Sequence, residues 1–176
     1  MLVVIEIPTR LVYIELIKNK TGSEISEKFD EICRRVKNPI KNLSMDAGSE
    51  FINKNFDKVL NEHNIIPYYH ANKNSMSIVE RMNRTIREKI QTLFNDRKNL
   101  VYYDKIENHS IEKVINDSYN RMIDKTPNNI KKEDIEKINK KNKDHNHRLF
   151  ENININVGDK VRLKKNKETF DKTGNK

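Results

Sequence analysis

The alternation of β-type runs with amphipathic helical segments most constrains how this chain can fold. Two apolar, β-branched runs, residues 2–7 and 11–17, flank a Pro-Thr-Arg breaker, and this pattern predicts an antiparallel hairpin. Helical and strand-like segments then alternate as far as residue 122. This order of elements predicts a mixed α/β domain with helices covering the faces of a sheet.

Local signals set the expected bounds of the later segments. Thr21 and Glu24 have the spacing of a capping box at a helix start, and the Asn38-Pro39 pair stops that helix. Residues 78–94 carry the clearest apolar stripe at helical spacing. The sequence predicts helices over 21–36, 56–60, 78–94 and 110–122, and strands over 40–45 and 65–69.

Charge and composition narrow the class of partner. Of the 176 residues 35% are hydrophobic and 35% charged, and the net charge is +9, which favours a polyanionic partner. Residues 159–176 carry seven basic against three acidic side chains, so this short tail holds +4 of that charge. Two alternatives remain open, a Lys- and Asn-rich bias from an A+T-rich genome and a solubilising disordered tail. The positive charge of residues 159–176 fits a phosphate-binding surface and a solubilising disordered tail equally well.

Cysteine usage and hydropathy exclude several classes. The single cysteine, Cys33, rules out a disulfide framework or a cysteine-based zinc site within this sequence. It fits a reducing compartment such as the nucleus or cytosol. No apolar run approaches the length of a membrane span, and the start lacks the basic region of a signal peptide. We therefore expect neither a membrane nor a small-molecule partner.

Two carboxylates lie where they could carry chemistry. Asp46 follows a predicted strand and precedes a glycine turn, whereas Glu80 lies in the first turn of the 78–94 helix. Glu80, Arg84, Arg87 and Gln91 share one helix face, opposite the apolar stripe. The ordinary interpretation is a Glu80–Arg84 surface ion pair. The functional one is a metal-assisted phosphoryl-transfer site, because hard cations prefer carboxylate oxygens and cationic side chains hold phosphates.

Several segments of the sequence resemble retroviral-type integrase cores, especially those of Maverick/Polinton elements and transposon-derived cellular proteins. Residues 46–51 (Asp-Ala-Gly-Ser-Glu-Phe) resemble the segment around the family's second acid. Residues 78–87 (Ile-Val-Glu-Arg-Met-Asn-Arg-Thr-Ile-Arg) resemble the helix that carries the third. The 33 residues between the two acids are close to the family's spacing. Weaker similarity extends over residues 3–10, 119–121, 125–127, 156–162 and 170–172.

The resemblance implies an RNase H-like fold that performs metal-dependent end processing and strand transfer of DNA. Asp46 and Glu80 would be the catalytic ligands of Mg²⁺ or Mn²⁺, and the protein would bind DNA as a homo-oligomer. Residues 1–123 would form the core, 124–150 a charged linker that is helical or disordered, and 151–176 the start of an SH3-like module. The residues that would contact DNA are Arg84, Arg87, Asn74, Ser75, Lys160, Arg162, Lys164 and Lys165.

The family's first acid lies on a strand upstream of the strand that opens this sequence. Glu6 matches a residue on the family's second strand, which is not a ligand there. With two of three carboxylates, the chain is expected to bind Mg²⁺ weakly and to be a partial, nearly inactive integrase-like protein. Two alternatives are a non-catalytic DNA-binding or interaction protein built on the same core, and another RNase H-like nuclease. The basic tail and the arginine-bearing helix face argue against the nuclease.

Overall fold

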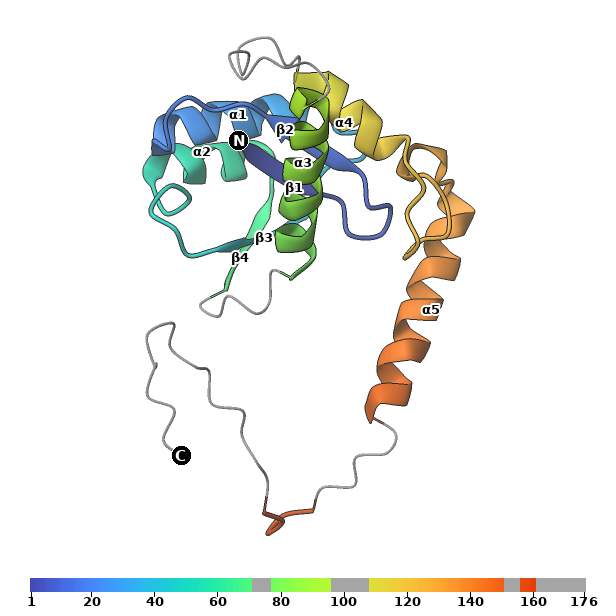
Figure 1. Ribbon diagram of the computed structural model, residues 1–176. Helices are drawn as coiled ribbons and strands as arrows, with labels where there is room; N and C mark the ends of the chain where they lie inside the picture. Colours follow the sequence, from blue (N-terminus) through green and yellow to red (C-terminus); the bar gives the residue numbers. More distant parts are fainter. Residues whose placement is uncertain (71–76, 96–107, 151–155, 161–176) are drawn as a thin grey trace, which may run out of the picture. The chain divides into compact units, whose positions relative to one another are not determined.

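The computed structural model describes residues 1–70, 77–95, 108–150 and 156–160 (Figure 1). The chain divides into two compact units, Met1–Ile138 and Asn139–Lys176. The first unit holds every described strand and is a mixed α/β fold, as the order of sequence patterns predicts. No helix among the described residues is both long enough and apolar enough to cross a membrane.

The chain opens with the predicted antiparallel hairpin. Strands β1 (Leu2–Ile5) and β2 (Val12–Glu15) pair with Leu2 opposite Glu15 and Ile5 opposite Val12. All four residues of β2 are buried, because it lies between two layers of helices. The connecting turn is closed by hydrogen bonds from the Arg10 N–H to the Glu6 carbonyl and from the Glu6 N–H to the Leu11 carbonyl, both 2.8 Å.

A second pair of strands is parallel and bears the first candidate acid. Strand β3 (Asn42–Asp46) lies beside β4 (Ile66–His70), with Asp46 in register with His70. The two strands are joined through helix α2 (Lys54–Glu62). Among the described residues the strands form two separate two-stranded sheets rather than the one mixed sheet expected. One edge of β1 and one edge of β3 are therefore not hydrogen-bonded to any strand among the described residues.

Helix α1 (Gly22–Arg35) packs its apolar face against α2. Thr21 caps the helix by accepting a hydrogen bond from the Glu24 N–H at 3.3 Å, as the sequence predicts. The Glu24 carboxylate does not return the bond of a capping box, because it accepts the N–H groups of Lys18 and Asn19 instead. The ring centroids of Phe29 and Phe56 lie 5.0 Å apart in the core between the helices. These contacts hold the α2 crossover against the sheets.

A second core cluster forms where β2 packs against helices α3 (Ser77–Asn95) and α4 (Asn108–Asn116). Ile86 and Ile90 of α3 are buried, but Ile78, which the stripe also includes, is 37% exposed. Helix α4 ends earlier than the predicted residue 122. The chain turns after it and forms a bridge between Asn120 and Lys125, which leaves Met122 56% exposed. The members of the cluster are Val12, Ile14, Ile86, Ile90, Ile111 and Ile115.

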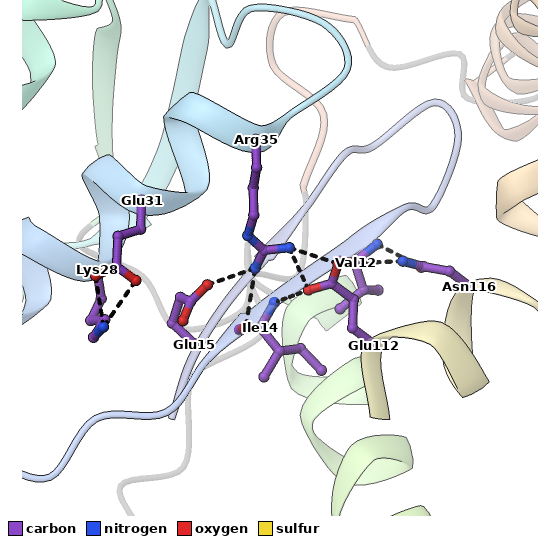
Figure 2. Close-up of polar contacts among 8 residues, drawn as sticks. All are labelled: Val12, Ile14, Glu15, Lys28, Glu31, Arg35, Glu112 and Asn116. Carbon is purple, nitrogen blue, oxygen red and sulfur yellow. Dashed lines mark hydrogen bonds and ion pairs between the residues drawn. The ribbon is translucent and has the colours of Figure 1, made fainter. Parts of the chain in front are cut away.

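Side chains rather than a neighbouring strand cover the outer edge of β2 (Figure 2). The Asn116 carboxamide accepts from the Val12 N–H at 2.9 Å and donates to the Val12 carbonyl at 2.8 Å. The Glu112 carboxylate accepts from the Ile14 N–H at 2.9 Å, and Arg35 donates to the Ile14 carbonyl at 3.1 Å. The Arg35 guanidinium also binds the carboxylates of Glu112 and Glu15. The pair with Glu112 ties α1 to α4, and the pair with Glu15 ties α1 to the end of β2.

Two further elements follow this core. A short 3-10 helix, η3 (Pro127–Asn129), leads into α5 (Lys132–Phe150), which falls within the segment predicted as a charged linker. The start of α5 is fixed because the Asp134 carboxylate accepts the Lys131 N–H at 2.9 Å and pairs with the Lys125 amine at 2.8 Å. Residues as far as Ile138, which is 9% exposed, belong to the first compact unit.

Candidate functional site

The candidate site begins at the carboxyl end of β3. Met45 is 4% exposed and packs into the core, so strand alternation directs Ser44 and Asp46 to the opposite, exposed face. The Ser44 hydroxyl lies 2.6 Å from the His70 Nε2, and His70 is the register partner of Asp46. Sequence reasoning missed Ser44 and His70, because only the pairing of the strands brings them together. The result is an exposed polar face that holds a serine, a histidine and a carboxylate.

The turn after this face is tightly built. The Gly48 carbonyl accepts the N–H groups of Phe51 and Ile52, both at 3.0 Å. The Asn53 side chain donates to the Glu50 carbonyl at 2.8 Å while its oxygen caps the start of α2. The backbone leaving β3 is therefore fixed by hydrogen bonds on both sides of the turn, which positions the preceding carboxylate.

The second candidate acid lies in the first turn of α3. Arg84 pairs with Glu88 at 3.9 Å, and the Glu80–Arg84 surface ion pair, which is the ordinary interpretation of their spacing, is not present. Within the described part of the chain Glu80 makes no ion pair. Its helix face points away from the core cluster, and the residues of that face are all exposed: Glu80, Arg84, Arg87 and Gln91.

The connection between the two acids limits their separation. His70, beside Asp46, ends β4, and six residues lie between it and Ser77, which begins α3. A link of this length spans at most roughly 25 Å. Figure 1 shows the end of β4 and the first turn of α3 on the same side of the fold. The arrangement is compatible with a shared site, and the convergence of Asp46 and Glu80 on one ion stays a prediction.

Comparison with known proteins identifies the fold. No protein-family model matches the sequence. Solved structures that are similar to this chain include the simian T-cell lymphotropic virus intasome bound to PP2A regulatory subunit B56 gamma, the HTLV-2 integrase catalytic core domain with magnesium in its dimeric form, and the BIV integrase catalytic core domain. Their TM-scores are 0.64, 0.58 and 0.60, at 20%, 21% and 17% identity. The similarity covers 71%, 71% and 80% of this chain, and 45%, 79% and 88% of the respective viral chains. This chain has the fold of a retroviral integrase catalytic core.

Sequence comparison finds a relative that is encoded in a cellular genome. An uncharacterized transposon-derived protein of Caenorhabditis elegans is 26% identical over 178 residues, which cover 98% of this chain. The chain spans 57% of that protein's length. The integrase-type core expected from residues 46–51 and 78–87 is therefore supported by both fold and sequence.

The integrase-core fold contains the ligand type that Mg²⁺ needs, but not a full set of ligands among the described residues. Asp46 and Glu80 offer exposed carboxylate oxygens, which hard cations prefer. No group of three or more His, Cys, Asp or Glu side chains suited to a metal occurs in the described ranges. The donors therefore match the cation in chemistry and fall short in number.

Most of the other residues expected to contact DNA lie outside the described residues: Asn74, Ser75, Arg162, Lys164 and Lys165. Lys160 is described and exposed. It follows a turn in which the Asn156 N–H binds the Asp159 carboxylate at 2.7 Å and Gly158 takes a φ of 103°.

Proposed function

We propose that this protein is integrase- or transposase-like and acts on DNA, with Asp46 and Glu80 as carboxylate ligands of Mg²⁺ or Mn²⁺. The observation that supports the proposal is the placement of these acids on an integrase-core fold. One lies exposed at the end of β3 and the other exposed in the first turn of α3. Arg84 and Arg87 would hold the DNA backbone, because they share the exposed face of Glu80.

The chemistry of such a site follows from its ligands. Divalent ions about 3.5–4 Å apart neutralise charge on the attacking and leaving oxygens of an in-line phosphoryl transfer. Asp46 would enter the site from a strand end held by hydrogen bonds, and Glu80 from a helix anchored by Ile86 and Ile90. Both carboxylates are then oriented by packing at some distance from the reacting groups. Such preorganisation lowers the cost of binding the cation.

The number of carboxylates limits the activity we expect. The resemblance to integrases implies three acidic metal ligands, and the described residues offer two of them, Asp46 and Glu80. The unpaired edges of β1 and β3 would accept a further strand, which could carry the third. Without it, the protein should bind Mg²⁺ weakly and join DNA ends poorly or not at all.

A strand-transfer assay tests this proposal. The chain is incubated with duplex oligonucleotide ends and Mg²⁺ or Mn²⁺, beside Asp46→Asn and Glu80→Gln, which keep side-chain size and remove charge. We expect duplex binding by all three proteins and at most trace joining by the parent chain, abolished in both variants. Efficient joining would contradict the incomplete site. Trace joining that persists in both variants would contradict the two ligands.

A second candidate function is non-catalytic DNA binding or interaction, which is favoured because the described residues offer no third donor at this face. This function predicts that the Asp46→Asn and Glu80→Gln variants bind duplex DNA as the parent chain does, and that binding does not require Mg²⁺ or Mn²⁺. Binding carried by residues 159–176, with their net charge of +4, should weaken steeply with salt. An affinity unchanged between about 50 and 200 mM salt would count against phosphate contacts.

Oligomerisation is part of the same proposal, because the HTLV-2 core is described in a dimeric form. Light scattering of this chain, with and without duplex oligonucleotides, measures its oligomeric state. A strictly monomeric protein under both conditions would argue against assembly on DNA ends. The SH3-like module over residues 151–176 also stays a proposal.

A further inference from the structure

The contact between Ser44 and His70 lies on the same face of the β3–β4 pair as Asp46. Ser44 and Asp46 are both exposed and lie two residues apart on β3, so both point away from the side of the buried Met45. The Ser44 hydroxyl lies 2.6 Å from the His70 Nε2, which places the His70 ring on that face as well. His70 is also in register with Asp46 on the neighbouring strand. The imidazole and the carboxylate therefore start from adjacent positions on one exposed face.

Both side chains keep an atom that can bind a ligand. Among the residues that the structure describes, the Asp46 carboxylate takes part in no hydrogen bond or ion pair, and His70 bonds only to Ser44. When the Ser44 hydroxyl accepts the Nε2–H of His70, the Nδ1 atom carries a lone pair. Asp46 is exposed and His70 is partly exposed, so a dissolved ion can reach both groups.

The geometry of paired strands suits a shared ion. Neighbouring strands lie about 4.8 Å apart, and a metal ion lies about 2 Å from an imidazole nitrogen or a carboxylate oxygen, so one ion can join two adjacent side chains. A histidine that binds a metal usually donates its other ring N–H to an oxygen, which fixes the orientation of the ring. The Ser44 hydroxyl is such an oxygen. Mg²⁺ requires oxygen ligands, whereas Mn²⁺ and the later transition ions also accept nitrogen.

We propose that His70 is a nitrogen ligand of the cation that Asp46 binds, and that Ser44 is the residue that positions its ring. The inference rests on the proposed function for a cation at Asp46 and deepens it, because it names the class of ion. With a nitrogen beside carboxylate oxygens, the site should prefer a transition ion such as Mn²⁺ over Mg²⁺. His70 ends β4, the strand that leads toward α3, so this donor lies on the Glu80 side of the pair.

A ligand role and a structural role of His70 predict different results. If the Ser44–His70 bond only joined the two strands, His70→Ala would change the affinities for Mn²⁺ and Mg²⁺ by the same factor. If His70 binds the ion, His70→Ala lowers the affinity for Mn²⁺ and leaves that for Mg²⁺ almost unchanged. Ser44→Ala keeps the imidazole and removes the oxygen that orients it, so its effect should be of the same kind and smaller.

The experiment titrates the full chain with Mn²⁺ and follows the electron paramagnetic resonance signal of the unbound ion, with Mg²⁺ as a competitor. His63→Gln is the matched control, because it removes an imidazole that pairs with Asp30 at 2.7 Å, away from β3 and β4. His70→Ala should weaken Mn²⁺ binding by about tenfold and change the Mg²⁺ affinity by less than about twofold. The control should change neither affinity by more than about twofold, and Asp46→Asn should weaken the binding of both ions.

A second measurement detects the nitrogen directly. Electron spin echo modulation of bound Mn²⁺ should show a coupled nitrogen in the parent chain and in His63→Gln, and none in His70→Ala. If Asp46→Asn weakens Mn²⁺ binding but His70→Ala does not, the nitrogen ligand is wrong while the proposed cation site stands. If Mn²⁺ binding depends on His70 but the chain neither binds nor joins DNA, the ligand stands and the proposed function falls. A parent chain that binds no Mn²⁺, or an equal loss of both ions in His70→Ala, would also overturn the inference, and the strand-transfer assay then decides the function separately.

Discussion

Replacing Asn116 with alanine tests the unusual way in which this fold covers a strand edge. The Asn116 carboxamide satisfies both the N–H and the carbonyl of Val12, at 2.9 and 2.8 Å, where a neighbouring strand would otherwise lie. Val12 is fully buried and Asn116 is 5% exposed, so water cannot readily take over these bonds. The variant therefore leaves two buried backbone groups without partners.

The expected loss follows from the cost of unpaired buried polar groups. Each such group costs about 1–3 kcal/mol, so the two Val12 groups set an upper bound of roughly 6 kcal/mol. Local relaxation or an entering water recovers part of this, and we expect a loss of about 3 kcal/mol. This is a large share of the roughly 5–15 kcal/mol that stabilises a typical domain. The melting temperature should fall by roughly 10 °C.

Urea unfolding followed by far-ultraviolet circular dichroism measures this loss. Lys113→Ala is the control, because Lys113 lies exposed on the same helix and its side chain leaves no backbone group of β2 unpaired. The control should change the free energy of unfolding by less than about 0.5 kcal/mol. A loss for Asn116→Ala that matches the control, with an unchanged dependence on urea, would refute the proposed role of the carboxamide.

Three further predictions follow from other contacts. Arg35→Met should lower the free energy of unfolding, measured in urea, by about 3 kcal/mol, because Glu15 and Glu112 lose the cation they share. A similar loss in Arg35→Lys, which keeps the charge, would show that the forked geometry of the guanidinium matters. Burial raises the pKa of Cys33 to about 12, so a thiol reagent at pH 8 should react slowly until guanidinium unfolds the chain; rapid reaction in the native state would contradict this. Hydrogen bonds from two backbone N–H groups lower the pKa of Glu24 below 4.5. Its stabilising effect should therefore be full above that value and disappear as the pH falls through the lowered pKa. The difference in melting temperature between the parent chain and Glu24→Gln, measured from pH 7 to pH 2, should shrink over that range, and a constant difference would refute it.

The sequence predicts local elements better than their ends or their pairing. The hairpin and the helix from Ser77 to Asn95 follow from strong periodic patterns, and both are confirmed within a few residues. Helix α4 stops at Asn116 although Met122 continues the apolar spacing, because the chain reverses there into the Asn120–Lys125 bridge. The division into two sheets could not be read from the sequence, since each strand's pattern is the same whichever neighbour it pairs with.

Candidate residues divide in a similar way. Helical spacing correctly placed Glu80 and Arg84 on one exposed face, but it could not decide the pairing of Arg84, which has an acid four residues away on either side. Ser44 and His70 carry no such signal, because only the pairing of β3 with β4 brings their side chains within 2.6 Å of each other. Spacing can therefore find groups that share an element, whereas sites built between elements need the tertiary structure.

The two faces of α3 make it possible to separate function from stability. Ile86 and Ile90 anchor the helix to the hairpin and α4, whereas Glu80 and the arginines of the outer face contribute no buried contact. Changes at Glu80 should leave unfolding almost unaltered, because exposed polar substitutions usually shift stability by less than about 0.5 kcal/mol. A loss of DNA chemistry there can be assigned to the site itself.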